Sequence, residues 1–460
     1  MNQLEKLFEG EKNKKLTENG DLAYKSTGDK LVDILFMTEY YQNHLDEVKI
    51  GDSDTEKLFS MFIRDPRYGL GRRDLGRVLM AKSKISAEDV VKAGRFDDLL
   101  YMSYKQQSNH SSIVNNDFIK FLYKEVKNGN ELAKKWCPRL NTSNEPMAKL
   151  LMKVWRLDEE HYRKLIKCES TTEYKLTHKQ DDLINFEHVP SLAMIKYFSA
   201  FYKRMPERFK QYQEDVKSGK KELKVSTTNV YDIYRNRDKI DAQVFFDKLE
   251  KIKINCIPIL DTSGSMQDSN DSIGKATSIA HYLAKCSTYC PDYVISFSSH
   301  PQLIHMGVDR KHSKDLNSWF GYNQSGFKRD YNTSNYINEV NSLYTGDCSN
   351  TDFGAVMELL SNLDNDLPEY LVVLSDMEFD QGSQTSKDDT MDLFKQRGYK
   401  TRIIWWNFNS RNTTVPEMDK DGNIYISGYS PFLLKYLQSG FDGKKFLEEL
   451  LKQYKENISK

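Results

Sequence analysis

The sequence predicts a multidomain protein that is α-helical in its N-terminal half and α/β in its C-terminal part. Up to about residue 225, apolar residues recur at i, i+3 and i+4, which is the spacing of helices. From about residue 251, short apolar runs typical of buried strands alternate with helical segments. Such alternation predicts a mostly parallel, doubly wound sheet. The expected domains are a helical repeat domain over 1–225, a linker over 226–250 and an α/β domain over 251–460.

The predicted helices of the N-terminal half are short. In "KLVDILFMTEYYQNHL", Leu31, Ile34 and Leu35 lie on one stripe. Several other helices begin with Ser, Asp or Pro at the expected cap position. A succession of short antiparallel helices suits a solenoid, as in HEAT-like repeats, or a closed ring of helical pairs. The segment "VKSGKKELKVSTTNVYDIYRNRDK" is polar and basic, so we interpret it as the linker.

The α/β part opens with the strand "KINCIPIL" and continues with three further strands, "DYVISFSS", "EYLVVLSD" and "KTRIIWWNFN". The segments between them, such as "SIGKATSIAHYLAKC" and "TDFGAVMELLSNL", have helical patterns, and two more predicted helices close the chain. In sheets of this kind, ligands bind at the carboxyl ends of strands. Polar residues in these positions are therefore the first candidates for a site.

Composition excludes some classes of protein. The 460 residues carry no net charge and contain no run of about 18 uncharged apolar residues, so we expect no membrane span. The charged N-terminal stretch has no apolar core and does not predict a secretory signal. The six cysteines form no CxxC pair, which favours free thiols in a reducing compartment. We expect a cytoplasmic protein.

Basic residues are concentrated in one part of the helical half. Residues 1–250 hold 45 Lys and Arg against 40 Asp and Glu, whereas residues 251–460 hold 22 against 27. The stretch from Lys196 to Arg235 has ten basic and five acidic residues, with aromatic residues between them. Such a pattern can provide phosphate contacts and base stacking. The alternative is an amphipathic helix whose aromatic residues face a core and whose charges are solvated.

The stretch "PILDTSGSMQDS" follows the first predicted strand. Asp261, Ser263 and Ser265 have the spacing D-x-S-x-S, and the intervening Gly264 lets the loop curl so that their oxygens converge. Hard divalent cations such as Mg²⁺ prefer oxygen ligands of this kind. A catalytic serine would need a histidine base, and the next histidine, His281, lies within a predicted amphipathic helix. A phosphate-binding loop would need a following Lys-Ser or Lys-Thr pair, which the sequence lacks.

Two further oxygen ligands stand at other strand or helix ends. Thr351 precedes a predicted helix, where it can also be an N-cap, and Asp376 follows a strand, where it can also be a turn residue. The order D-x-S-x-S, Thr, Asp resembles the metal-ion-dependent adhesion site (MIDAS) of von Willebrand factor A domains. The resemblance covers about residues 251–440. Met377 stands where these domains often have glycine.

This resemblance implies a magnesium site, or a site for another divalent cation such as Mn²⁺. In the family the metal is not a hydrolytic catalyst, and its open coordination position takes a carboxylate or other anion from a partner. The implied ligands are Asp261, Ser263, Ser265, Thr351 and Asp376.

The helical half resembles the helical (TROVE) module of the Ro ribonucleoprotein autoantigen. "FIRDPRYGLGRRDLGR" and "KAGRFDDLLYM" match two runs of that module, with Phe96 where tryptophan is usual. The resemblance implies a ring of helical repeats that binds RNA on a basic surface. The alternation of Arg and Asp also fits a salt-bridge network between helices, for example between Arg64 and Asp65. Candidate RNA-binding residues are Arg64, Arg67, Arg72, Arg73, Arg77, Lys203, Arg204 and Arg208.

A related family with the same two-part layout, which includes proteins of bacterial viruses, resembles nearly the whole chain in stretches such as "AKKWCPRL", "FEHVPSLAM" and "SDMEFD". Two functions follow as hypotheses. The first is a non-catalytic, Ro-like scaffold that binds structured or single-stranded RNA and recruits a partner through its metal. The second is a metal-dependent protein-interaction adaptor or virion-associated protein without RNA binding. Both place the protein in the cytoplasm, or in a host cytoplasm or virion if it is viral. Neither involves a membrane or sequence-specific DNA binding.

Overall fold

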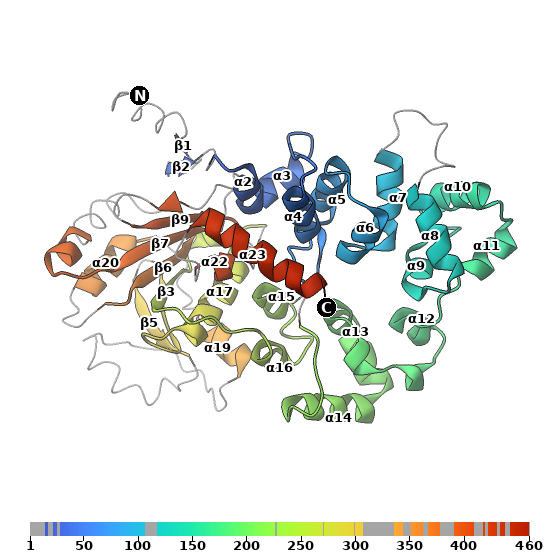
Figure 1. The fold of residues 1–460 in the computed structure, drawn as a ribbon. Coiled ribbons are helices and arrows are strands. Elements are labelled where there is room, and N and C mark those ends of the chain that lie inside the picture. The colour runs from blue at the N-terminus through green and yellow to red at the C-terminus, as the bar shows by residue number, and fades with distance from the viewer. Residues whose placement is uncertain are drawn as a thin grey trace, which may run out of the picture. The chain divides into compact units, whose positions relative to one another are not determined.

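The computed structural model divides the chain into two compact units. The sheet unit comprises Met1–Gly28 and Thr228–Gly443, and the helical unit comprises Asp29–Thr227 and Lys444–Lys460 (Figure 1). The structure describes residues 14–16, 22–24, 28–105, 117–225, 228–269, 271–298, 300–306, 335–343, 351–361, 367–377, 391–408, 417–418, 422–429, 433–437 and 442–459.

The helical unit is built from short helices, as the periodicity predicts. Helix α4 begins at a capping box in which Ser53 and Glu56 bond to each other's backbone N–H groups. Pro146 stands in the first turn of α10, where its missing N–H costs nothing. The described helices are α2 (Lys30–Phe36), α3 (Thr38–Asn43), α4 (Asp54–Arg64), α5 (Arg73–Lys82), α6 (Ala87–Ala93), α7 (Phe96–Lys105), α8 (Asp117–Lys127), α9 (Glu131–Trp136), α10 (Glu145–Trp155), α11 (Glu159–Leu165), α12 (Thr172–Thr177), η2 (Asp181–Leu183), η3 (Phe186–His188), α13 (Ser191–Arg204), α14 (Pro206–Lys217) and α23 (Gly443–Ile458).

The last helix, α23, packs within the helical unit, although the sequence places it in the α/β domain. Phe446 stacks on Phe36 with ring centroids 6.3 Å apart, and Tyr454 meets Phe62 edge-on at 5.6 Å. The Tyr454 hydroxyl also donates to Asp65 at 3.3 Å. The compact sheet unit thus ends at Gly443, and the rest of α23 belongs to the helical unit. An apolar helix face shows that α23 needs a partner surface but does not identify it.

The expected linker over 226–250 differs as well. Its described residues form α15 (Val230–Arg235) and α16 (Ala242–Asp247), and both helices bury their apolar side chains in the sheet unit. Each helix is only six residues long, so its periodicity is hidden by the charged residues around it. The chain passes between the units at Thr227 and Thr228.

The sheet unit contains a seven-stranded mixed sheet in the order β5-β4-β3-β6-β7-β9-β8. Its central strands β4, β3, β6, β7 and β9 are parallel, and β5 and β8 pair antiparallel at the two edges. The described elements are β3 (Cys256–Asp261), η4 (Gly264–Met266), α17 (Ser272–Cys286), β4 (Tyr293–Phe297), β5 (Gln302–His305), α19 (Tyr336–Ser342), α20 (Phe353–Ser361), β6 (Tyr370–Ser375), β7 (Arg402–Asn407), β8 (Glu417–Met418), β9 (Ile424–Ser427) and α22 (Leu433–Tyr436); β1 (Lys14–Leu16) and β2 (Leu22–Tyr24) form a separate hairpin.

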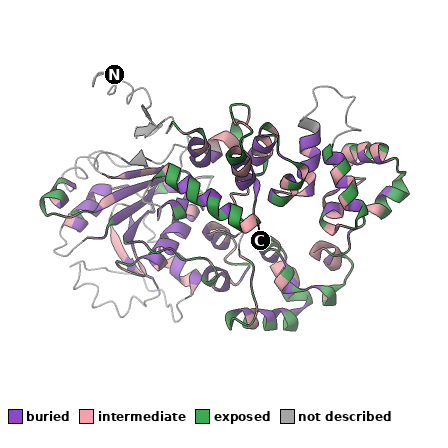
Figure 2. Cartoon of the chain, in the orientation of Figure 1, coloured by how far each residue is buried: buried purple, intermediate pink, exposed green. Residues whose placement is uncertain are grey.

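Both faces of the central sheet are buried. Ile257 and Ile259 of β3 join a core cluster with α20, whereas Leu260, which points to the other face, is also fully buried, and α17 contacts β3. Figure 2 shows the buried central strands in purple. The predicted combination of a helical half and an α/β half with parallel strands is therefore confirmed. Among the described residues, no helix is long and apolar enough to cross a membrane.

Candidate metal site and arginine cluster

The D-x-S-x-S loop lies at the carboxyl end of the central strand β3. Asp261 is its last residue and is completely buried. The backbone N–H of Ser263 donates to the Asp261 carboxylate at 2.9 Å, and the Ser263 and Ser265 hydroxyls are 3.1 Å apart. The turn into η4 therefore brings three oxygen-bearing side chains together, as the spacing predicts.

Asp376 directly follows the neighbouring strand β6 and lies at the same carboxyl end of the parallel strands. Because β3 and β6 are parallel with Leu260 opposite Leu374, the residues that follow lie side by side. The Ser375 hydroxyl donates to the Asp261 carboxylate at 2.5 Å and accepts from the Met377 N–H at 3.0 Å. Ser375 thus ties Asp261 to the turn that carries Asp376, which is also completely buried.

Met377 has a φ of +66°, in the left-handed region that favours glycine. Glycine would adopt this backbone shape freely. Met377 adopts it as a non-glycine residue, and its side chain is buried in the core cluster beside α20. The substitution therefore leaves the turn intact.

Thr351 lies at the same end of the sheet, because its neighbour Asp352 is bonded to the residue that follows β4. The N–H of Asp352 donates to the carbonyl of Ser298 at 3.0 Å, directly after the end of β4, where Phe297 pairs with Asp261. The helix cap that the sequence allowed for Thr351 is instead Asp352, whose carboxylate accepts from the Ala355 N–H at 3.0 Å. Thr351 itself is buried.

The electrostatics of Asp261 suit a cation. Burial raises its pKa to about 6, hydrogen bonds from Ser263 and Ser375 oppose the rise, and the negative charge of Asp376 adds to it. Within the described part of the chain, the donors to Asp261 are neutral hydroxyl and amide groups. Two buried carboxylates and three hydroxyls are hard oxygen donors, so the set fits Mg²⁺ or Mn²⁺ and not a soft metal.

Further side chains brace the loop that leaves the site. Asp268 accepts from the N–H and the hydroxyl of Ser272, the first residue of α17, both at 2.8 Å. The Tyr231 hydroxyl of α15 donates to Asp271 at 2.7 Å. His281 of α17 is buried and its Nε2 contacts Glu339 at 2.7 Å, so it is a packed histidine, as expected. Neither Ser375 nor Tyr231 was among the site residues that the sequence predicts; the signal for Ser375 is its position directly before Asp376.

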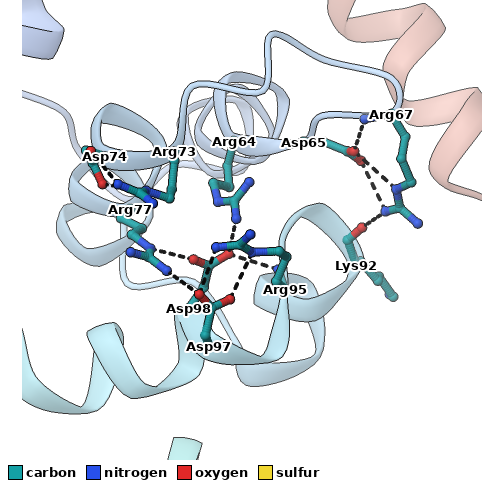
Figure 3. Close-up of polar contacts among 10 residues, drawn as sticks. All are labelled: Arg64, Asp65, Arg67, Arg73, Asp74, Arg77, Lys92, Arg95, Asp97 and Asp98. Atoms are coloured by element: carbon teal, nitrogen blue, oxygen red, sulfur yellow. Dashed lines mark hydrogen bonds and ion pairs between the residues drawn. The ribbon is translucent and has the colours of Figure 1, made fainter. Parts of the chain in front are cut away.

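The arginine-rich motif of the helical unit forms an intramolecular network (Figure 3). Arg64 is buried and pairs with Asp98 at 2.8 Å, not with Asp65 as the sequence suggested. Arg77 contacts Asp97 at 2.9 Å and Asp98 at 2.5 Å. These pairs join α4, α5 and α7, and we name the set the arginine cluster; its members are Arg64, Asp65, Arg67, Arg73, Asp74, Arg77, Arg95, Asp97 and Asp98.

The glycines of the motif serve the same packing. A Cβ on Gly76 would lie 2.6 Å from the Cβ of Arg64, and one on Gly69 would lie 1.9 Å from the carbonyl oxygen of Phe62. Asp65 fixes the turn between α4 and α5, because its carboxylate accepts from the N–H and the guanidinium of Arg67. The motif is therefore explained by close helix contact and charge pairing within the chain.

This network changes the set of RNA-binding candidates. Arg64 is not a candidate for RNA binding, because its guanidinium is buried. Arg77 is mostly buried and shared between two aspartates, whereas Arg67 and Arg73 are half-exposed but each pairs with an aspartate. Arg72 lies at the start of α5, partly buried. The cluster is thus close to electroneutral.

The candidates near α13 and α14 differ from one another. Arg204 forms two bonds to Asp181, at 2.5 and 3.0 Å, and Arg208 donates to the carbonyls of Asp181 and Ile184. Both fasten the end of α13 and the start of α14 to the loop before them. Lys203 is exposed. The aromatic residues between these charges divide too: Phe201, Phe209 and Tyr212 are buried, and Tyr202 is 56% exposed.

Comparisons with known proteins identify two regions. Residues 132–250 match the family described as "Domain of unknown function (DUF2828)", and residues 255–459 match "Domain of unknown function (DUF7788)". The chain is 22% identical to the uncharacterized protein L728 of Acanthamoeba polyphaga mimivirus, over 96% of this chain and 88% of that protein. Among solved structures, the Ro (RSR) protein of Deinococcus radiodurans matches with a TM-score of 0.41 and 10% identity, over 95% of each chain.

Proposed function

We propose that the sheet unit is a divalent-metal-dependent binding module and that the protein is a non-catalytic scaffold. The observation that carries the proposal is the convergence of Asp261, Ser263 and Ser265 with Asp376 across two parallel strands. The same arrangement of residue types at strand ends motivated the likeness to the adhesion site of von Willebrand factor A domains.

The residues of the site would divide the work. Ser263, Ser265 and Thr351 supply neutral hydroxyls, and Asp261 and Asp376 supply the negative charge that a buried cation needs. Ser375 and the Ser263 N–H hold the Asp261 carboxylate in place. A bound Mg²⁺ would offer an open coordination position to the carboxylate of a protein partner. A partner with an exposed Asp or Glu fits this chemistry.

Calorimetric titration of the full chain with Mg²⁺ and Mn²⁺ tests the proposal. We expect saturable binding at one site that Asp261→Asn abolishes. Ser375→Ala should weaken binding by about 10- to 100-fold, as loss of a residue that orients a ligand does. The matched control is Asp292→Asn, because Asp292 directly precedes β4. It therefore lies at the amino ends of the parallel strands, away from the carboxyl ends that hold the site. Metal binding that survives Asp261→Asn would disprove the site.

As a second function, we propose that the helical unit binds RNA. The exposed basic and aromatic side chains of α13, and not the arginine cluster, favour it. Fluorescence anisotropy with a structured RNA that has a single-stranded end, measured across a salt series, gives the test. Binding that weakens steeply with salt supports RNA binding. No binding at low salt leaves the metal-dependent adaptor as the function of the protein.

A further inference from the structure

Helix α13 has an unusual charge composition for this protein. Its sequence, SLAMIKYFSAFYKR, contains three basic residues and no Asp or Glu. Every other described helix of the helical unit carries at least one acidic residue. The basic residues of those helices have acidic neighbours on the same helix, and those of α13 do not.

Two of the three basic residues of α13 share one face with the exposed Leu192. Leu192, Lys196, Ser199 and Lys203 follow the i, i+4, i+7, i+11 spacing of a single stripe, and all four are exposed. Tyr202 flanks the stripe and is 56% exposed. The opposite face, with Met194 and Phe201, is buried (Figure 2). Lys196 and Lys203 are about 10 Å apart along the helix axis, at 1.5 Å per residue.

Ion pairs within the chain engage only some of the basic residues of α13. Arg204 is held by Asp181, so it serves the fold. Among the residues that the structure describes, neither Lys196 nor Lys203 forms an ion pair with an Asp or Glu, and Glu173 acts on the pKa of Lys196 only through its charge. The Lys196 ammonium lies 4.9 Å from the ring centre of Tyr197, which places a cation beside an aromatic surface.

We propose that this face of α13, formed by Lys196, Tyr202 and Lys203, binds single-stranded nucleic acid. The proposal rests on the RNA-binding function proposed above and names its contact surface. The two lysines would contact two phosphates of the strand, and the Tyr202 ring would stack on an unpaired base. A duplex hides its bases, so the exposed ring favours a single strand.

Anisotropy of a fluorescent 12-nucleotide oligo(U) on the full chain, measured between about 50 and 200 mM salt, tests the surface. Lys196→Ala/Lys203→Ala should weaken binding by about 10- to 30-fold at 0.1 M salt and reduce the salt slope by about 1.4, at 0.7 per lost phosphate contact. The matched control is Lys120→Ala/Lys124→Ala, which removes two exposed lysines from α8, a helix that also carries acidic residues.

The tyrosine separates a single strand from other polyanions. Tyr202→Ala should weaken oligo(U) binding by about 5-fold or more, and Tyr202→Phe should bind like the wild type, because stacking needs only the ring. Tyr68→Ala, which removes an exposed tyrosine in another part of the unit, is the control. Polyglutamate and a duplex RNA of the same length are the competitors.

The possible results are distinct. If the wild type binds oligo(U) and the α13 variants behave like the α8 control, the surface is wrong and RNA binding by the helical unit stands. If Tyr202→Ala has no effect and polyglutamate competes as well as RNA, α13 is a general polyanion surface and the single-strand proposal is overturned. If the wild type binds no RNA at low salt, both the surface and the proposed RNA function fail.

Discussion

Each unit holds a cluster of polar residues that is conspicuous in the sequence, and the two clusters differ in how their charges are paired in the structure. The arginine cluster brings arginines and aspartates together so that each charge meets an opposite one, and Arg64 and Asp98 are buried as a pair. At the carboxyl ends of β3 and β6, Asp261 and Asp376 are buried near each other. Within the described part of the chain, the hydrogen bonds to Asp261 come from neutral groups. The first cluster pairs its arginines with aspartates of the same chain. The second places two buried carboxylates near each other, and a bound cation would balance their charge.

The comparison shows how to weigh a conspicuous motif. Charged residues that recur with glycine at close spacing can serve packing alone, as Arg64 and Gly76 do. Two buried carboxylates close to each other carry an electrostatic cost. Such a cost is typical of a site that binds an external ligand.

Removal of residues 444–460 should have the largest effect. The helix α23 buries Phe446, Leu447, Leu450, Leu451 and Tyr454. At about 1.5–3 kcal/mol for each buried side chain, their loss exceeds or equals the stability of a typical domain. We expect the helical unit to unfold while the sheet unit keeps its own melting transition, measured by calorimetry. Loss of the sheet-unit transition alone would contradict the division of the chain.

Substitution of one aspartate in each cluster tests the contrast directly. Asp98→Asn leaves the buried Arg64 without its partner and should lower the free energy of unfolding of the helical unit by about 3–5 kcal/mol. Asp261→Asn removes a buried negative charge beside another and should leave the metal-free sheet unit equally stable or more stable. Denaturant unfolding measures both. Similar losses for the two variants would show that the clusters are alike.

Gly76→Ala should have an intermediate effect. The added methyl would lie 2.6 Å from the Arg64 Cβ and 2.7 Å from its Cα, so α4 and α5 must separate. Overpacking of this kind costs about 1–3 kcal/mol. Thermal unfolding of the helical unit measures the loss. A variant as stable as the wild type would mean that the two helices adjust freely and that the motif does not need this glycine.

Tyr231→Phe should have the smallest effect. It removes the hydrogen bond from α15 to Asp271, which is worth about 0.5–1.5 kcal/mol. The ring stays in contact with Tyr429, at a centroid distance of 5.6 Å. The sheet unit should lose about that much stability and retain its metal affinity. A large loss of Mg²⁺ affinity would show that α15 holds the metal loop in shape.

Local patterns in the sequence predicted the convergence of the polar residues at the ends of β3 and β6 better than they predicted the pairings of the arginine cluster. Asp261, Ser263 and Ser265 are neighbours in the chain, and parallel strands bring Asp376 to the same edge. The pairing of Arg64 with Asp98 joins residues 34 positions apart, and its choice over Asp65 depends on how α4, α5 and α7 pack. The sequence also could not show that α23 returns to the helical unit. A hydroxyl residue directly before Asp376 was the available signal for Ser375.

The central claim is that Asp261 and its neighbours at the carboxyl ends of β3 and β6 bind a divalent cation. The arginine cluster, in contrast, should bind none. The most direct test is the melting temperature of the full chain with and without Mg²⁺ for the wild type, Asp98→Asn and Asp261→Asn. At a 100-fold excess over Kd, binding adds about 2.7 kcal/mol, or roughly 5–10 °C for a unit of this size. We predict that Mg²⁺ raises the sheet-unit transition in the wild type and in Asp98→Asn and leaves Asp261→Asn unchanged. An equal rise in Asp261→Asn would contradict the claim.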